Sequence, residues 1–304
     1  MFWQVVSATI DGVTSGATLF LVAVGLSLIF GVLKVLNAAH GSFYAIGAFT
    51  AAWAWGVIGA IGLPTYCIYP CLFVSALVVG VLLGPPLERL LLRWTFDIEP
   101  ATRRENLQLL ATFAAFLMLE DAQKLVFGTS PYYSGGALGL LGATRIGGLL
   151  HTNYQLLLVP LAGLVLLALR IFLRRSRIGR WMIAVAADAE MASAMGIRVG
   201  PVRVLSFTLG AVLAALGGAL ASPTVGVSIG IGADMMVLSF AVVAIAGLGQ
   251  IEGAVLAAVI IGIAHSLAVF FLPVLSTVAP FLIMLLVLLV RPIGLFGPVR
   301  QRSI

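Results

Sequence analysis

The sequence predicts an all-α protein that crosses a membrane many times, and two observations lead to this prediction. Hydrophobic residues make up 62% of the 304 residues and charged residues only 9%, with a mean hydropathy of +1.17. Soluble domains carry about 25% charged residues, so this chain cannot cover itself with a water-compatible surface. Apolar runs of roughly 20 residues also recur along the chain, and each is long enough to cross a hydrocarbon core. The short alternating segments typical of a membrane β-barrel are absent.

The distribution of basic residues predicts how the chain is oriented. The net charge is +6, and all of the 17 basic residues except Lys34, Lys124 and Arg145 fall within residues 89–104, 170–203 and 291–302. Basic clusters at the ends of apolar segments are typical of cytoplasmic loops, whereas a phosphate-binding surface would gather them into one stripe. We therefore expect a lipid bilayer, and no nucleic acid, beside these charges.

Placing all three clusters in the cytoplasm predicts about eight or nine crossings, because an even number of crossings must separate each pair of clusters. The N-terminus then lies outside and the C-terminus inside. Residues 236–249 form a short segment bounded by glycine, which favours a half-helix, and residues 128–153 resemble an external loop in composition. No separate soluble domain is indicated, so residues 1–304 form one transmembrane domain. Its predicted crossings are residues 13–33, 40–61, 65–83, 107–127, 154–173, 204–221, 236–249, 252–271 and 274–290.

The segment RRSRIGRWMIAVAADAEMASAMGIRVGPVR, residues 174–203, predicts two short helices at the cytoplasmic face. The first covers residues 180–187. Asp188 suits the N-cap of the second, and Glu190 complements the dipole in its first turn. Gly196 ends that helix as a C′ glycine. Such a segment would suit either a docking partner or the lipid interface, and the residues alone leave both open. The apolar side chains expected to be exposed are Trp181, Met182, Met191 and Met195.

Polar residues interrupt the apolar stretch SLIFGVLKVLNAAHGSFYAIGAF, residues 27–49. Asn37 and His40 are placed to bond backbone groups freed by a break between two membrane segments. For His40, a hydrogen bond to backbone and a role in a solute or proton pathway both stay open. The spacing Gly-x5-Gly-Ala of residues 41–48 recurs at residues 247–254, which indicates related halves with a solute path between them. The residues predicted to line that path are Asn37, His40, Gly41, Ser42, Tyr44, Gly47, Gly247 and Gly249.

Two further groups of polar residues have structural interpretations. Lys124 lies at i+4 from Glu120 and at i+3 from Asp121, so an ion pair on one helix face is expected. Gln250 and Glu252 either pack against residues 174–203 at the inner face or belong to a solvated turn.

Three motifs carry a resemblance to a known family. Residues 25–41 read G-L-S-L-I-F-G-V-x-x-V-x-N-x-A-H-G, and residues 175–197 read R-x-R-x-G-R-x-M-x-A-V-A-x-D-x-E-x-A-x-x-M-G-I. The third motif is SFAVVAIAGLGQIEGAVLAAVIIG, residues 239–262. In this order they resemble the permeases of ABC importers for branched-chain amino acids, most closely the LivH-type member of the permease pair. Ser42 departs from the family pattern, which commonly has an acidic residue after His-Gly.

The resemblance implies a permease subunit of the bacterial cytoplasmic (inner) membrane that imports leucine, isoleucine, valine or a similar small polar solute. It also implies a second homologous permease subunit, two cytoplasmic P-loop ATPase subunits and an external solute-binding protein. The chain itself has no G-x-x-x-x-G-K-[ST] loop, so ATP is expected on the ATPase subunits and no cofactor or enzymatic activity on this chain. The residues expected to couple ATP hydrolysis to the membrane helices are Arg180, Asp188, Glu190, Met195 and Gly196.

A stand-alone ion-coupled carrier for small organic solutes is the alternative function, with Asp11, His40 or Glu120 taking the coupling proton. It predicts carboxylates at membrane depth, whereas most acidic residues lie near segment ends. An intramembrane enzyme needs a converging nucleophile, base or metal set, which three scattered histidines do not supply. Cys67 and Cys71, four apart, suit neither a disulfide nor a complete metal site, so no metal is expected.

Overall fold

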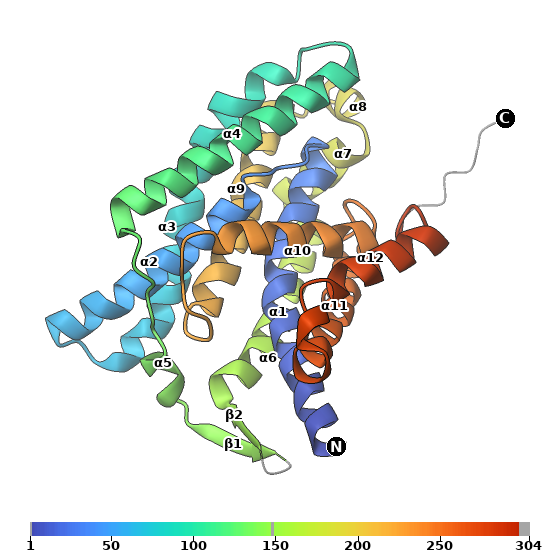
Figure 1. The fold of residues 1–304 in the computed structure, drawn as a ribbon. Coiled ribbons are helices and arrows are strands. Elements are labelled where there is room, and N and C mark those ends of the chain that lie inside the picture. The colour runs from blue at the N-terminus through green and yellow to red at the C-terminus, as the bar shows by residue number, and fades with distance from the viewer. Residues whose placement is uncertain (1, 147–148, 298–304) are drawn as a thin grey trace.

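The computed structural model describes residues 2–146 and 149–297, and almost all of the regular structure in them is helical (Figure 1). The basic residues Arg300 and Arg302 of the predicted C-terminal cluster lie outside the described residues. In chain order the elements are α1 (Phe2–Leu33), α2 (His40–Ile61), η1 (Thr65–Cys67), α3 (Ile68–Leu87), η2 (Glu88–Leu92), η3 (Arg93–Thr95), α4 (Ala101–Phe127), α5 (Gly136–Gly139), β1 (Ala143–Ile146), β2 (Leu149–Thr152), α6 (Asn153–Arg175), α7 (Arg177–Ala187), α8 (Ala189–Ala194), α9 (Val199–Ala221), α10 (Ile231–Ala246), α11 (Ile251–Phe271), η4 (Pro273–Leu275) and α12 (Ala279–Val290).

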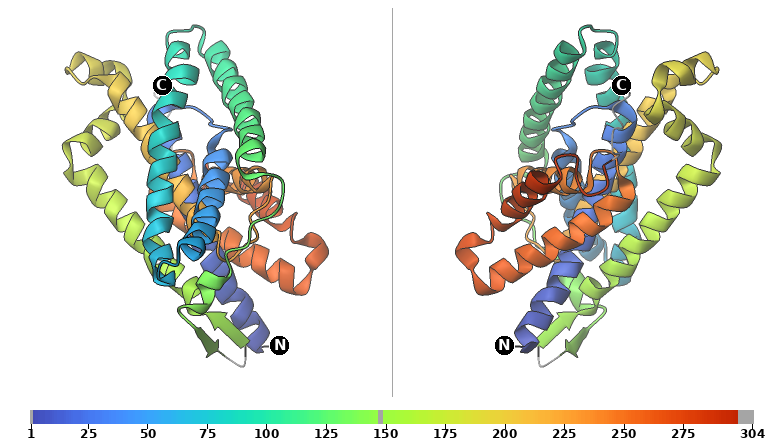
Figure 2. Two further views of the ribbon diagram at one scale, coloured as in Figure 1. Left: turned by 90° about the vertical axis from the view of Figure 1, so that its left-hand side faces the viewer. Right: turned by 90° about the vertical axis from the view of Figure 1, so that its right-hand side faces the viewer.

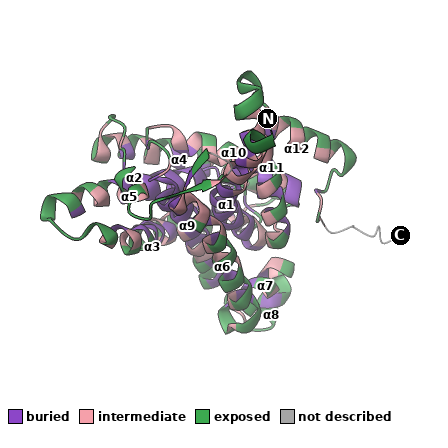
Figure 3. Cartoon of the chain, turned by 90° about the horizontal axis from the view of Figure 1, so that it is seen from below, coloured by how far each residue is buried: buried purple, intermediate pink, exposed green. Residues whose placement is uncertain are grey.

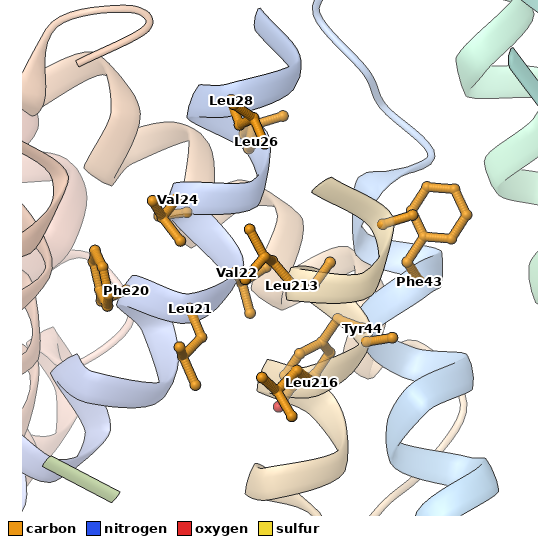
Figure 4. Packing of buried hydrophobic residues seen from close by; sticks show 14 of the residues in the cluster. Phe20, Leu21, Val22, Val24, Leu26, Leu28, Phe43, Tyr44, Leu213 and Leu216 are labelled. Atoms are coloured by element: carbon orange, nitrogen blue, oxygen red, sulfur yellow. The ribbon is translucent and has the colours of Figure 1, made fainter. Parts of the chain in front are cut away.

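Helix α1 forms the centre of the molecule. It packs most extensively against α11 and α9 and also contacts α10 and α6. Nearly every residue from Thr14 to Leu33 is buried, and a helix that is hydrophobic all round is expected to be enclosed by other helices. Seen along the bundle, buried residues gather around α1 and α9 while the outer helices are exposed (Figure 3). In the core, Val22 of α1 meets Leu213 of α9, and Tyr44 of α2 lies beside Leu216 (Figure 4).

Small residues set the distances between the central helices. A Cβ atom added at Gly25 of α1 would lie 2.6 Å from the carbonyl oxygen of Gly210 in α9. One added at Gly12 would lie 2.5 Å from the Cα atom of Ile263 in α11. Membrane helices associate through this kind of close backbone approach, because lipid tails give apolar side chains no reason to prefer each other over lipid.

The structure confirms a polytopic helical protein. Within the described residues, six helices are long and apolar enough to cross a membrane. They are α1, α2, the continuous helical stretch Thr65–Thr95, α6, α9 and α11, and they correspond to six of the nine predicted crossings. Helix α1 begins at Phe2, well before the predicted residue 13.

The other three predicted crossings correspond to helices that are not both long and apolar enough to cross a membrane by this criterion. Helix α4 has 27 residues but carries charged side chains near both of its ends. Helices α10 and α12 have 16 and 12 residues, so at 1.5 Å per residue they extend about 24 and 18 Å. Helix α10 lies across the long axis of α1 (Figure 1). Its short length agrees with the prediction of a half-helix at residues 236–249, although α10 begins earlier, at Ile231.

The two ends of the bundle differ in composition. The N-terminus of α1 and the antiparallel β1–β2 hairpin lie at one end, and α7, α8 and the connection from α3 to α4 lie at the other (Figures 1 and 2). The predicted loop 128–153 therefore contains the short helix α5 and a hairpin, whose four-residue strands are too short for a periodic sequence signal. The basic clusters 89–104 and 170–203 lie at the end opposite the hairpin.

Candidate functional site: a cavity, a helix break and a surface segment

The break between α1 and α2 is held by side chains, as the sequence predicts. Lys34, the first residue after α1, has a positive φ of 58°. In the following turn the side-chain oxygen of Asn37 accepts a hydrogen bond from the Ala39 N–H at 3.1 Å. The Thr112 hydroxyl oxygen of α4 accepts another from the Ala38 N–H at 3.2 Å. Irregular backbone inside a membrane protein is tolerated where protein groups satisfy it in this way.

The predicted path residues at the start of α2 lie in packed helix contacts. His40 Nε2 lies 2.9 Å from the carbonyl oxygen of Val22, which agrees with the interpretation of a histidine bonded to backbone. Gly41 packs against Gly232 of α10, and Gly47 packs against Ala215 of α9. The Ser42 hydroxyl donates to the carbonyl oxygen of Phe116 at 3.4 Å. Of the eight predicted path residues, Tyr44 alone lines the cavity between α1, α6, α9, α10 and α11 described below.

Gly247 and Gly249 lie at a different place, at the turn between α10 and α11. Both have positive φ values, 98° and 82°, which explains why glycine suits these positions. Gly247 packs against Gly294 and Gly297, and Gly249 lies against Gly31 near the end of α1. The structure thus separates the two glycine motifs, one in helix packing and the other at an interhelical turn.

A cavity of about 430 Å³ opens between α1, α6, α9, α10 and α11. Asp11, Thr14, Ser15 and Thr18 of α1 provide polar groups along one wall. The rest of the lining is mostly apolar but includes the polar residues Gln155, Thr224, His265 and Ser266. This volume falls within the range of roughly 300–1,000 Å³ that is usual for small-molecule sites.

Asp11 is held at this cavity by a buried histidine. His151 of β2 is only 3% exposed, and its Nδ1 atom lies 3.2 Å from the Asp11 Oδ1 atom. Its Nε2 atom lies 3.1 Å from the Ser7 hydroxyl. Sequence reasoning considered Asp11 only for a coupling proton and gave His151 no role, because nothing local indicates that residues so far apart in the chain meet.

The predicted coupling segment forms the two short helices α7 and α8 at the end opposite the hairpin (Figure 1). Asp188 caps α8 by accepting hydrogen bonds from the Glu190 and Met191 N–H groups at 2.9 and 3.0 Å. Gly196 follows the helix with a φ of 86°, so the predicted N-cap and C′ positions are confirmed. Helix α7 begins earlier than predicted, at Arg177, with Ser176 as its N-cap.

The predicted coupling residues are all exposed, but one of the apolar side chains predicted to be exposed is buried. Arg180, Asp188, Glu190, Met195 and Gly196 are all exposed. Trp181, Met191 and Met195 are exposed as predicted, at 44%, 66% and 82%. Met182 is instead fully buried, because the inner face of α7, with Gly179, Met182 and Val185, packs on the membrane helices.

A groove of about 300 Å³ joins the coupling segment to the start of α11. Its lining includes Ile183 of α7 and both Gln250 and Glu252, which agrees with the interpretation that these two residues face the segment. Glu252 Oε1 lies 3.3 Å from Arg174 Nη2 and 3.5 Å from Arg170 Nε of α6. Because these side chains are more than half exposed to solvent, the two ion pairs contribute little to the stability of the fold.

Two further contacts of charged side chains lie away from the cavity. Lys124 Nζ lies 2.9 Å from Asp121 Oδ1 and 3.4 Å from Glu120 Oε1, which confirms the predicted ion pair. Just after η3, the centre of the Phe96 ring lies 3.8 Å from the guanidinium carbon of Arg203, a cation–π contact that the sequence did not indicate. Among the described residues, no group of three or more His, Cys, Asp or Glu side chains could hold a metal ion.

The sequence matches the family described as branched-chain amino acid transport system / permease component over residues 8–290. The high-affinity branched-chain amino acid transport system permease protein LivH of Escherichia coli (strain K12) is 32% identical over 297 residues, which cover 94% of each chain. The corresponding protein BraD of Pseudomonas aeruginosa is 29% identical over 294 residues, covering 95% of this chain and 94% of BraD. The probable branched-chain amino acid transport permease protein LivH of Methanocaldococcus jannaschii is 29% identical over 293 residues, covering 92% of this chain and 88% of the relative.

Proposed function

The chain belongs to the family of permease components of branched-chain amino acid transport systems, and from that membership we propose that it forms the transmembrane path of an ATP-driven importer for leucine, isoleucine and valine. It is a multi-pass membrane protein and a transport subunit rather than an enzyme. The observation that carries the proposal is the match over nearly the whole chain, from residue 8 to residue 290.

The proposed topology has nine crossings in the bacterial inner membrane, with the N-terminus outside and the C-terminus in the cytoplasm. Contacts at one end of the bundle support it. The Gly249 turn lies against Gly31 at the end of α1, and the Leu295 N–H donates to the Ile245 carbonyl at 2.8 Å. These contacts bring the chain beyond α12, with Arg291, to the same end as the Arg174–Glu252 pair. All three basic clusters would then face the cytoplasm, as the positive-inside rule expects.

The proposed assembly adds a second homologous permease subunit, two cytoplasmic P-loop ATPase subunits and an external solute-binding protein. What supports the ATPase partner is the coupling segment, whose five predicted residues are exposed while α7 is anchored by Met182 and Val185. A helix pair fixed on its inner face and exposed on its outer face can pass a rigid-body movement to α6 and α9. A cytoplasmic surface with exposed Met191 and Met195 is also the kind that has a partner.

The test is uptake of leucine by the reconstituted complex. The chain is co-expressed with the proposed partner subunits, purified and placed in proteoliposomes, and radiolabelled leucine uptake is measured with ATP on the side of the ATPase subunits. We expect uptake that requires ATP and the binding protein and that stops with a non-hydrolysable ATP analogue. Uptake by this chain alone, driven by an ion gradient without ATP, would contradict the proposal and favour the carrier.

A further inference from the structure

We propose that the cavity between α1, α6, α9, α10 and α11 binds the solute during transport, and that Asp11 receives the ammonium group of an α-amino acid. This inference rests on the proposed importer function and adds to it a site and a chemical selectivity. The observation from which it starts is a carboxylate in the wall of a cavity of about 430 Å³ that is otherwise built from membrane helices. Asp11 lies near the start of α1 at the hairpin end of the bundle, which the proposed topology places outside, so a solute arriving from outside can reach its charge.

The surroundings of Asp11 leave its negative charge available to a ligand. The neighbouring His151 ring can donate from Nδ1 to Asp11 at 3.2 Å and accept at Nε2 from the Ser7 hydroxyl at 3.1 Å. In that arrangement both ring nitrogens of His151 have hydrogen-bond partners, and the ring orients the Asp11 carboxylate. No Lys or Arg side chain lies among the cavity-lining residues, so an ammonium group of the ligand would supply the counter-charge.

The helix face next to Asp11 offers further acceptors. Thr14 and Thr18 follow Asp11 at i+3 and i+7, and therefore lie on one face of α1. Their hydroxyl groups donate to the backbone carbonyl oxygens of Asp11 and Ser15 at 2.9 and 2.8 Å. Each hydroxyl oxygen therefore keeps lone pairs for a ligand. Because an ammonium group has three N–H donors and no acceptor, this face is complementary to it.

The remaining walls suit the rest of a branched aliphatic amino acid. Met235 and Leu238 of α10 and Ile261 of α11 provide an apolar surface for the side chain. Gln155 of α6 accepts the Thr152 hydroxyl through Oε1 at 2.9 Å, which leaves its amide N–H groups to donate to a carboxylate. A neutral solute such as urea carries no positive charge to pair with Asp11 and no apolar group to fill these walls.

Protection of a cavity cysteine tests where the solute binds. Ser15 is exposed, so Ser15→Cys is introduced with Cys67→Ser and Cys71→Ser, which remove the two native thiols. The purified complex is alkylated with a small maleimide, with and without saturating leucine. We expect leucine to slow alkylation severalfold, and neither urea nor 4-methylpentanoate, the deaminated analogue of leucine, to do so. Equal protection by 4-methylpentanoate, or no protection by leucine, would overturn the inference.

Substitutions at Asp11 test the role of its charge. Asp11→Asn keeps the shape of the side chain and should abolish protection and reduce leucine uptake by roughly tenfold or more, the effect of losing a charge-assisted hydrogen bond. Asp11→Glu keeps the charge and should retain part of both activities. Asp121→Asn, in the exposed pair with Lys124, is the matched control and should behave as wild type. Wild-type uptake by Asp11→Asn would overturn the role of Asp11.

These readouts separate this inference from the proposed function. If the wild-type complex imports leucine with ATP but Ser15→Cys is not protected, the importer stands and the cavity assignment fails. If leucine protects Ser15→Cys but no ATP-dependent uptake occurs, the amino-acid site stands and the importer function fails.

Discussion

At the residue scale, positions without a side chain decide how the central helices meet. Gly25 of α1 faces the Gly210 backbone of α9 and also the His40 ring, whose Cε1 atom would lie 3.2 Å from an added Cβ. That ring is in turn held by the Val22 carbonyl. One small residue therefore sets both the separation of α1 from α9 and the space in which α2 begins.

Gly25→Val should destabilise the protein, because its side chain would force α1 and α9 apart. Overpacking a well-packed interior costs about 1–3 kcal/mol, and contact with backbone rather than with a flexible side chain places this case at the upper end. The measurement is the melting temperature of the purified complex in detergent. Gly163→Ala in α6 is the control, since an added Cβ there meets no heavy atom within 4 Å and should cause no loss. Equal losses for both variants would contradict the packing argument.

At the element scale, the coupling segment combines a locally determined shape with a tertiary anchor. Its caps are local, since Ser176 bonds the Gly179 N–H at 2.8 Å and Asp188 bonds two N–H groups of α8. Its attachment is tertiary, because Met182 and Val185 are buried against the membrane helices. The local sequence thus determines the helices of the surface that a partner would contact, and packing determines the position of that surface relative to the membrane helices.

Asp188→Ala should loosen α8 and weaken coupling to the ATPase subunits. Removing an N-cap acceptor costs about 0.5–2 kcal/mol of helix stability, and a frayed α8 would present its exposed face less often. We expect a severalfold decrease in ATP-driven leucine uptake and in ATPase retention during purification. Asp188→Asn can cap the helix equally well and should restore both. If Asn is as defective as Ala, the charge of Asp188 matters and the cap does not.

At the scale of the whole molecule, the bundle is built around α1 and α9, and its two ends differ in charge and structure. The hairpin end contains the Asp11–His151 pair and the cavity, while the other end contains α7, α8 and the Arg174–Glu252 pair. Helices α2 and α3 pack on α9, and α11 packs on α1. The cavity therefore lies between the central pair and the helices that flank it.

Labelling of single cysteines should show that these ends face opposite sides of the membrane. Arg145→Cys in β1 and Arg177→Cys in α7 are each introduced with Cys67→Ser and Cys71→Ser, and both positions are exposed. A membrane-impermeant maleimide added to intact spheroplasts should label Arg145→Cys only. Arg177→Cys should react only after the membrane is permeabilised. The reverse pattern would invert the proposed topology, and labelling of both in intact spheroplasts would contradict it.

The sequence by itself determined the features that depend on composition or on neighbours in the chain. Its apolar runs predicted nine crossings, and six of these are helices long and apolar enough to span a membrane in the described part of the chain. Residue types at fixed spacing predicted the Asp188 cap, the Gly196 end and the Lys124–Asp121 pair. These features need only one helix or turn to form. They are therefore visible without knowledge of the packing.

Only the tertiary structure decided which faces of the helices meet. In α1, which is hydrophobic all round, the sequence periodicity contains no signal for the side that packs on α9 or the side that borders the cavity. Tertiary contacts likewise decided the burial of Met182, which the sequence placed at the surface, and the meeting of Asp11 with His151, which it did not predict. Both depend on contacts between segments far apart in the chain. Composition alone does not distinguish between the many possible contacts of this kind, whereas close packing of the helices allows only some of them.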